Sequence, residues 1–133
     1  MWLLDTNAWI AYLERKPNPV KSKIASVPES SILLCDVVKA ELIYGAYKSA
    51  RVEQNLTKLD ILFSLVNSLP FDGNAAREFG KIRAYLAKQG TPIGSYDLQI
   101  AAIAMAHNLT LVTHNTREFS RIIGLRLEDW ELE

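Results

Sequence analysis

Short apolar runs alternate along this chain with longer segments in which apolar residues recur every three or four positions. The short runs, which predict strands, cover residues 3–4, 31–35, 69–71, 109–113 and 125–127. The periodic segments, which predict helices, cover residues 8–14, 36–48, 51–67, 74–88 and 96–107. Asp36 is the expected N-cap of the second helix. Strands that alternate with helices indicate a parallel sheet covered on both faces and joined by right-handed crossovers.

The size and composition of the chain suit a single domain spanning residues 1–133. Apolar residues make up 49% and charged residues 23% of the sequence, which is ordinary for a globular protein. No apolar run approaches the ~18 residues needed to span a bilayer, and the N-terminus has no secretion signal. The only cysteine, Cys35, excludes an internal disulfide and fits a reducing compartment. We therefore expect a cytoplasmic protein with no membrane partner.

The formal net charge is zero, which by itself does not indicate a nucleic-acid-binding protein. Four of the 15 acidic residues lie within the last six positions, at Glu128, Asp129, Glu131 and Glu133. With those four set aside, residues 1–127 hold 15 basic and 11 acidic residues, a net charge of +4. The charge distribution therefore permits an RNA-binding face but does not require one.

Three carboxylates stand at the edges of apolar elements. Asp5 ends the first strand, Glu41 lies inside an apolar helix, and Asp97 begins the apolar segment that runs to residue 106. Because an isolated buried carboxylate is costly, the three together indicate a shared divalent cation. Oxygen-only ligands suit Mg²⁺ or Mn²⁺ better than zinc. Taken singly, Asp5 could cap the next helix, Glu41 could face solvent, and Asp97 could interact with the helix dipole.

The predicted topology places these acids near one another. Sites in parallel α/β sheets form beyond the carboxyl ends of the strands. Asp5 ends the first strand, and Thr113, His114 and Asn115 lie at the end of the fourth, so these residues share a crevice if the two strands are neighbours. Helical spacing places Glu41 and Asp97 on the apolar faces of their helices, pointing inward.

Small polar residues beside the acids could support them. Thr6, Asn7 and Thr113 could hydrogen-bond the carboxylates or a scissile phosphate, or could act only as caps and turn residues. The two histidines, His107 and His114, show no metal-ligand spacing and are expected to be structural or solvent-facing.

Four segments of the sequence resemble a known family in their order and spacing. They cover residues 4–7, 40–45, 90–97 and 113–119. Together they resemble the PIN domain, specifically the VapC toxins of bacterial toxin–antitoxin pairs. The resemblance extends over essentially the whole chain, including the ending at residues 124–130.

This resemblance implies a three-layer α/β/α fold with a small, mainly parallel central sheet, and metal-dependent endoribonuclease activity. It also implies a homodimer and inhibition by a cognate VapB-type antitoxin. Carried over by position, Asp5, Glu41 and Asp97 would be the catalytic triad that binds Mg²⁺ or Mn²⁺. Asn115 falls where many family members have a fourth acid, so it could hold a metal-bound water or orient Asp5. Glu118 is the nearest acid that could substitute.

The resemblance also bears on substrate and product. Residues 90–97 and 124–130 are most similar to VapC toxins that cut tRNA, notably initiator tRNA in its anticodon stem-loop, and hydrolysis would leave a 5′-phosphate and a 3′-hydroxyl. Two other functions stay open. A catalytically degenerate PIN-like interaction domain fits the loss of the fourth acid. An aspartyl-phosphate phosphatase would use Asp5 as nucleophile, but it would need a second acid where Asn7 stands.

Overall fold

A parallel five-stranded sheet forms the centre of the computed structural model, which describes residues 1–132. The strands are β1 (Trp2–Leu4), β2 (Ile32–Cys35), β3 (Ser68–Leu69), β4 (Thr110–Val112) and β5 (Leu127–Glu128). Their order across the sheet is β3-β2-β1-β4-β5, and each neighbouring pair is parallel. The parallel sheet expected from the sequence is therefore confirmed. Glu133, one of the four terminal acids, lies outside the described residues.

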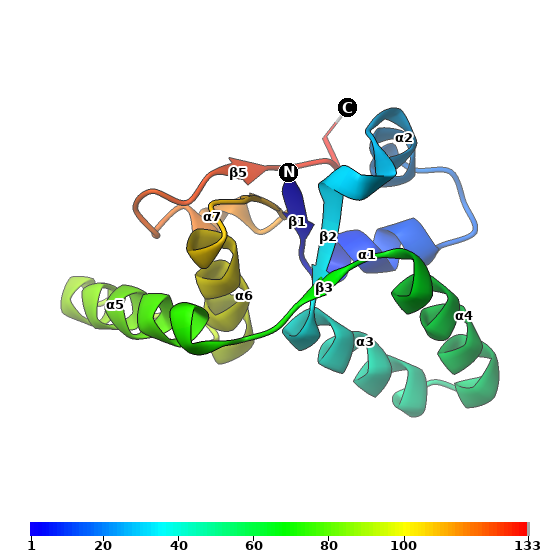
Figure 1. The fold of residues 1–133 in the computed structure, drawn as a ribbon, viewed down its shortest axis with the longest axis horizontal. Coiled ribbons are helices and arrows are strands. Elements are labelled where there is room, and N and C mark those ends of the chain that lie inside the picture. Colours follow the sequence, from blue (N-terminus) through cyan, green and yellow to red (C-terminus); the bar gives the residue numbers. More distant parts are fainter. Residues whose placement is uncertain (133) are drawn as a thin grey trace.

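Helices cover the sheet on both sides and complete the three layers (Figure 1). They are α1 (Thr6–Leu13), α2 (Pro19–Ser26), α3 (Asp36–Lys48), α4 (Val52–Leu65), α5 (Gly73–Gln89), α6 (Ser95–Ala106) and α7 (Thr116–Phe119), with a 3-10 turn at Glu29–Ser31. In Figure 1, α5 and α6 lie on one side of the central strands, and α1 and α4 lie on the other. Within residues 1–132, no helix is both long and apolar enough to cross a bilayer.

The core lies between the sheet and the helices packed on it. Leu3, Leu4 and Leu111 on the strands are fully buried. Helix α6 is buried almost all round, from Leu98 to Ala104, as expected for a helix that is apolar on nearly every side. Several of its buried residues are alanines, which let neighbouring elements approach closely. Asp97 lies in the first turn of this helix, next to the point where its buried part begins at Leu98.

The structure corrects several expected elements. Helix α2 was not predicted, because only Val20 is buried on it and its start depends on the Asn18 side chain, which accepts a hydrogen bond from the Lys21 amide. Helix α7 was also not predicted, since four residues give no readable period. The N-cap of α3 is Cys35 and not Asp36, whose Oδ1 instead accepts a 2.6 Å hydrogen bond from the Ser68 hydroxyl. Strand β5 lies two residues later than expected at its start.

Candidate metal and active site

The carboxyl ends of β1, β4 and β5 meet at one edge of the sheet. The Asp5 amide donates to the Val112 carbonyl and the Thr113 amide donates to the Glu128 carbonyl, both at 3.0 Å. Strand β1 lies between β2, the next strand along the chain, on one side and β4 on the other side. Such a switch in strand order opens a crevice at the carboxyl edge of a parallel sheet. Strands β1 and β4 are therefore neighbours, as the crevice expected from the sequence requires.

Asp5 is buried at this edge, with 6% of its surface exposed. Its Oδ1 accepts a 3.0 Å hydrogen bond from the Ala8 amide, so it does cap α1. Burial raises the pKa of the Asp5 carboxyl, while hydrogen bonds from the Thr113 hydroxyl and the Ala8 amide oppose that rise. The cap uses one oxygen, and the negative charges of Glu131 and Glu41 also raise the pKa of the Asp5 carboxyl, so other acids lie near it. Both sequence interpretations of Asp5 are therefore compatible.

Glu41 projects from the second turn of α3 and is partly buried. Its Oε1 accepts a 2.7 Å hydrogen bond from the Thr6 hydroxyl, the first side chain after Asp5. This contact joins α3 to the start of α1 and orients the Glu41 carboxylate. Thr6 thus contacts one of the carboxylates, as its position in the sequence suggested.

Asp97 lies in the first turn of α6 and is also partly buried. Burial, and then the negative charges of Asp5, Glu41 and Glu118, together raise the pKa of this carboxyl to about 6. Four acids from separate parts of the chain therefore repel one another across one crevice. Such an arrangement is unfavourable without a compensating positive charge.

Asn115 contacts both Glu118 and Thr113. Its Nδ2 donates a 3.1 Å hydrogen bond to Glu118 Oε2, and its backbone amide donates to the Thr113 hydroxyl. The negative charge of Glu118 contributes to the raised pKa of Asp97. The hydrogen bond from the Asn115 side chain therefore holds a fourth acid near the carboxylates of Asp5, Glu41 and Asp97. Asn7, by contrast, is exposed and lines an open pocket together with Asn115.

The donor atoms at this edge are carboxylate oxygens of Asp5, Glu41, Asp97 and Glu118, and hard divalent cations take oxygen ligands. Among residues 1–132, however, the oxygens of Asp5, Glu41 and Asp97 do not all lie within 4.8 Å of one another, so a cation bound by all three would draw them closer together. The buried thiol of Cys35 is not among these donors. Burial and the repulsion from the neighbouring acids both raise the pKa of Asp97, and a bound cation would offset both by stabilising the ionised carboxylate.

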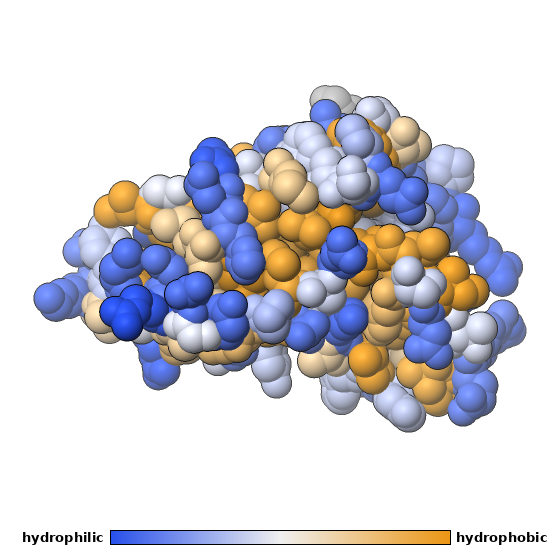
Figure 2. All heavy atoms as spheres, viewed as in Figure 1, coloured by the Kyte–Doolittle hydropathy of each residue, from blue (hydrophilic) through white to orange (hydrophobic). Residues whose placement is uncertain are grey.

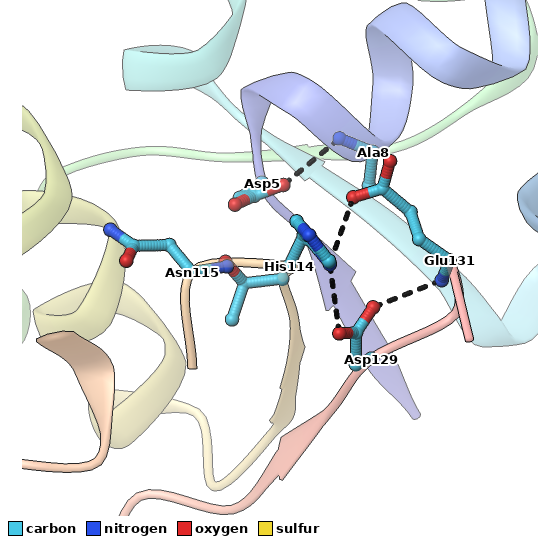
Figure 3. Close-up of polar contacts among 7 residues, drawn as sticks. Asp5, Ala8, His114, Asn115, Asp129 and Glu131 are labelled. Atoms are coloured by element: carbon cyan, nitrogen blue, oxygen red, sulfur yellow. Dashed lines mark hydrogen bonds and ion pairs between the residues drawn. The ribbon is translucent and has the colours of Figure 1, made fainter. Parts of the chain in front are cut away.

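A second group of ligand-type side chains lies at the same edge and was missed from the sequence. His114 Nδ1 lies 2.9 Å from Asp129 Oδ2 and 3.4 Å from Glu131 Oε2 (Figure 3). The hydrogen bond with Asp129 and the charge of Glu131 raise the pKa of the His114 imidazole. His107 is exposed, as expected. No spacing rule reveals the group, because its members come from the ends of two different strands.

Comparisons with known proteins agree with this architecture. Residues 2–125 match the family model described as "PIN domain". The chain is 42% identical to a protein of Shigella flexneri named "tRNA(fMet)-specific endonuclease VapC", over 97% of each chain. It is 37% identical to "Ribonuclease VapC2" of Rickettsia felis, over 98% of each.

Solved structures of toxin–antitoxin complexes contain chains with the same fold as this one. The structure of VapBC2 from Rickettsia felis bound to a promoter DNA fragment contains a chain that matches with a TM-score of 0.90 at 37% identity, covering 97% of this chain and 98% of that one. The DNA-bound VapBC of Salmonella typhimurium matches with a TM-score of 0.89 at 41% identity, covering 97% of each.

Proposed function

The chain belongs to the PIN-domain family, as a VapC ribonuclease toxin of a toxin–antitoxin pair, and from this we propose that Asp5, Glu41 and Asp97 hold the divalent cation with which it hydrolyses RNA. PIN-domain nucleases depend on divalent metals, and the oxygen-only donor set favours Mg²⁺ or Mn²⁺ here. We further propose that residues 1–133 form one such domain.

The observation that carries this proposal is the placement of Asp5, Glu41 and Asp97 at one edge of the sheet, where β1 and β4 end side by side, Thr6 joins Glu41 to the start of α1, and the neighbouring acids help to raise the pKa of Asp97. The raised pKa results from burial and from three other carboxylates, and within residues 1–132 no lysine or arginine forms an ion pair with Asp5, Glu41 or Asp97. A purely structural cluster would be expected to carry a lysine or arginine partner. Among residues 1–132, the salt bridges join Lys81 to Glu78, and His114 to Asp129 and Glu131.

The side chains around the crevice position the carboxylates. Thr6 fixes one oxygen of Glu41 at 2.7 Å, and Ala8 and Thr113 fix Asp5. When bound, the cation supplies Lewis-acid activation of a phosphate oxygen and lowers the pKa of a water for in-line attack. Hydrolysis of this kind leaves a 5′-phosphate and a 3′-hydroxyl.

Glu118 is proposed as the fourth acid of the site. The family position for this acid carries Asn115, whose amide donates to Glu118 Oε2 at 3.1 Å. The bond keeps Glu118 directed towards Asp97 from the first turn of α7. In this interpretation Asn115 positions Glu118, and the acid lost at position 115 is replaced from position 118.

We propose tRNA as the substrate, with initiator tRNA the first candidate. The relatives from Shigella flexneri and Salmonella typhimurium are both named tRNA(fMet)-specific endonucleases, and they are 42% and 41% identical to this chain. Cleavage is expected in the anticodon stem-loop, where unstacked bases are accessible.

The partner is a VapB-type antitoxin, and its docking surface is proposed to lie over α1, α3 and α4. A groove between these helices is lined mainly by apolar side chains, including Ile10, Leu42 and Leu59, and Glu41 is among its lining residues. Exposed apolar residues continue over α4, as Figure 2 shows, and include Ile61 and Leu65. An antitoxin seated there would cover the approach to Glu41. A homodimer is proposed from the family resemblance.

Partner-free protein tests the chemistry. We expect it to cut tRNA in Mg²⁺ or Mn²⁺ and to be inactive in EDTA, with activity restored when the metal is added back. The downstream product should be a substrate for 5′-phosphate-dependent exonuclease. Cleavage that continues unchanged in EDTA, or products with 2′,3′-cyclic phosphates, would contradict a metal-dependent hydrolysis.

Mapping of RNA ends in cells tests the substrate. After brief expression of the toxin, new 5′-phosphate ends should accumulate in the anticodon stem-loop of initiator tRNA before other RNAs are affected. If tRNAs stay intact while messenger or ribosomal RNA is cut, the proposed substrate is wrong but the proposed chemistry is unaffected.

A further inference from the structure

An imidazole lies between two carboxylates at the edge of the sheet that carries Asp5. The contacts join His114 Nδ1 to Asp129 Oδ2 at 2.9 Å and to Glu131 Oε2 at 3.4 Å. In Figure 3 these three side chains point towards one another, and the Asp5 carboxylate lies on the far side of the imidazole from Asp129. The ligand atoms all lie within 4.8 Å of one another. Among residues 1–132, this is the one His, Cys, Asp and Glu group with that spacing.

The backbone fixes the geometry of this group. His114 follows β4 and Asp129 follows β5, and the two strand ends are joined by the 3.0 Å bond from the Thr113 amide to the Glu128 carbonyl. The Asp129 side chain is only 10% exposed. Its Oδ1 accepts a 3.0 Å hydrogen bond from the Glu131 amide, which leaves Oδ2 for His114 and turns Glu131 back towards the imidazole. Strand pairing and this hydrogen bond therefore bring the three residues together around the largely buried Asp129, while the side chains of His114 and Glu131 are 62% and 41% exposed.

We propose that His114 Nδ1, Asp129 and Glu131 form a second metal site, which binds one transition-metal cation of the zinc class. An imidazole nitrogen with two carboxylates is a donor set that zinc accepts, whereas the oxygen-only set at Asp5, Glu41 and Asp97 suits Mg²⁺ or Mn²⁺. Bonds of about 2.0–2.2 Å from one ion to each donor fit ligand atoms that lie within 4.8 Å of one another. On binding, any proton on Nδ1 is released to solvent and the cation takes its place.

The site is open to solvent on one side. His114 and Glu131 line a pocket together with Asn7 and Asn115, so a cation held there would keep coordination positions free for water or for an RNA group. A bound cation would also fasten the segment after β5 to the end of β4. The only thiol of the chain, Cys35, is buried and does not compete for the metal. The site uses none of the residues assigned to the catalytic cation, so it does not depend on the proposed function.

Zinc binding by the full-length protein tests the site. Isothermal titration with Zn²⁺ is compared for the wild type, His114→Gln, Glu131→Gln and the matched control His107→Gln, which changes the other, exposed histidine. Excess Mg²⁺ is present throughout to occupy the carboxylate crevice. We expect the wild type and H107Q to bind one more Zn²⁺ than H114Q, and E131Q to bind that ion more weakly by about tenfold or more.

The His114 imidazole gives an independent readout that does not need a variant to fold. In the wild type, its ¹⁵N signals should shift to those of a metal-bound nitrogen on addition of one equivalent of Zn²⁺, while the His107 signals stay in place. Equal Zn²⁺ binding by the wild type and H114Q, or a His114 signal that does not respond to Zn²⁺, would show that the group is an ion-paired clamp only and would overturn the proposal.

Discussion

Replacing Asp97 by asparagine should stabilise the metal-free protein while it abolishes RNA cleavage. The asparagine keeps the volume of the side chain and removes a charge that burial and the carboxylates of Asp5, Glu41 and Glu118 disfavour. The crowded negative charge that would attract a cation lowers the free energy of unfolding when no cation is bound. Stability and activity should therefore change in opposite directions, which is a pattern that a simple structural role for Asp97 does not produce.

The size of the effect follows from the shift in pKa. The carboxyl moves from an ordinary value of 3.8 to about 6 in the folded protein. At about 1.4 kcal/mol for each pH unit, this corresponds to an upper value of about 3 kcal/mol. Because Asp97 is partly exposed, solvent screening reduces that figure, and we expect about 1–3 kcal/mol. For a domain of this size, the melting temperature of D97N should rise by roughly 4–10 °C.

The pH dependence has a definite sign. A folded-state pKa above the unfolded value means that the folded protein binds the proton more tightly, so the cost is absent below pH 3.8 and fully developed above about pH 6. The wild type should therefore lose stability relative to D97N as the pH rises between about 4 and 6. Thermal or urea unfolding in EDTA at pH 4 and at pH 7.5 measures this difference.

Two controls make the comparison sharp. Asp60→Asn changes an exposed aspartate on α4 and should leave stability unchanged at both pH values. Adding Mg²⁺ or Mn²⁺ at pH 7.5 should stabilise the wild type by mass action and D97N much less. If D97N is no more stable than the wild type in EDTA at pH 7.5, or if its advantage is the same at pH 4, the electrostatic reasoning about the crevice is wrong.

Three further substitutions test separate contacts. Thr6→Val removes the hydroxyl that orients Glu41 and should lower the single-turnover cleavage rate by about 10–100-fold with little change in melting temperature; an unchanged rate would mean that this bond is only structural. Glu118→Gln should lower the rate by about tenfold, and Asn115→Ala should reproduce this loss because it releases Glu118; wild-type rates in both would exclude Glu118 as the fourth acid. Gly90→Ala should cost about 1 kcal/mol in urea unfolding without affecting cleavage, because Gly90 ends α5 with a φ of +70°.

The sequence predicted the fold well where packing is periodic. Helix α6 was identified because its apolar residues occur on nearly every side, and β1 and β4 were identified from short apolar runs. Helix α2 and helix α7 were missed for a physical reason. One depends on a side-chain cap at Asn18 and buries little apolar surface, and the other is too short to show a period.

The candidate site was predictable in outline, because its carboxylates interrupt apolar elements. Asp5, Glu41 and Asp97 each stand where burial is otherwise costly, and the strand order then brings them into one electrostatic field. The contact from Asn115 to Glu118 was not predictable, since it depends on how α7 turns away from β4.

The group around His114 shows a different limit. Its ligands come from the ends of β4 and β5, and the two carboxylates are aligned by a hydrogen bond from the Glu131 amide to Asp129. A sequence pattern shows only that acids crowd the end of the chain. The pairing of the strands decides that they face a histidine 15 residues earlier.

Cleavage of initiator tRNA by single carboxylate variants tests the central claim most directly. Single-turnover rates in Mn²⁺ are measured for the wild type, Asp5→Asn, Glu41→Gln, Asp97→Asn and the exposed control Asp60→Asn, each checked for folding by thermal unfolding. We expect D60N to cleave at the wild-type rate and the three crevice variants to lose cleavage by at least about 100-fold while they remain folded. A folded crevice variant that cleaves at the wild-type rate would contradict the assignment of these carboxylates to the metal site.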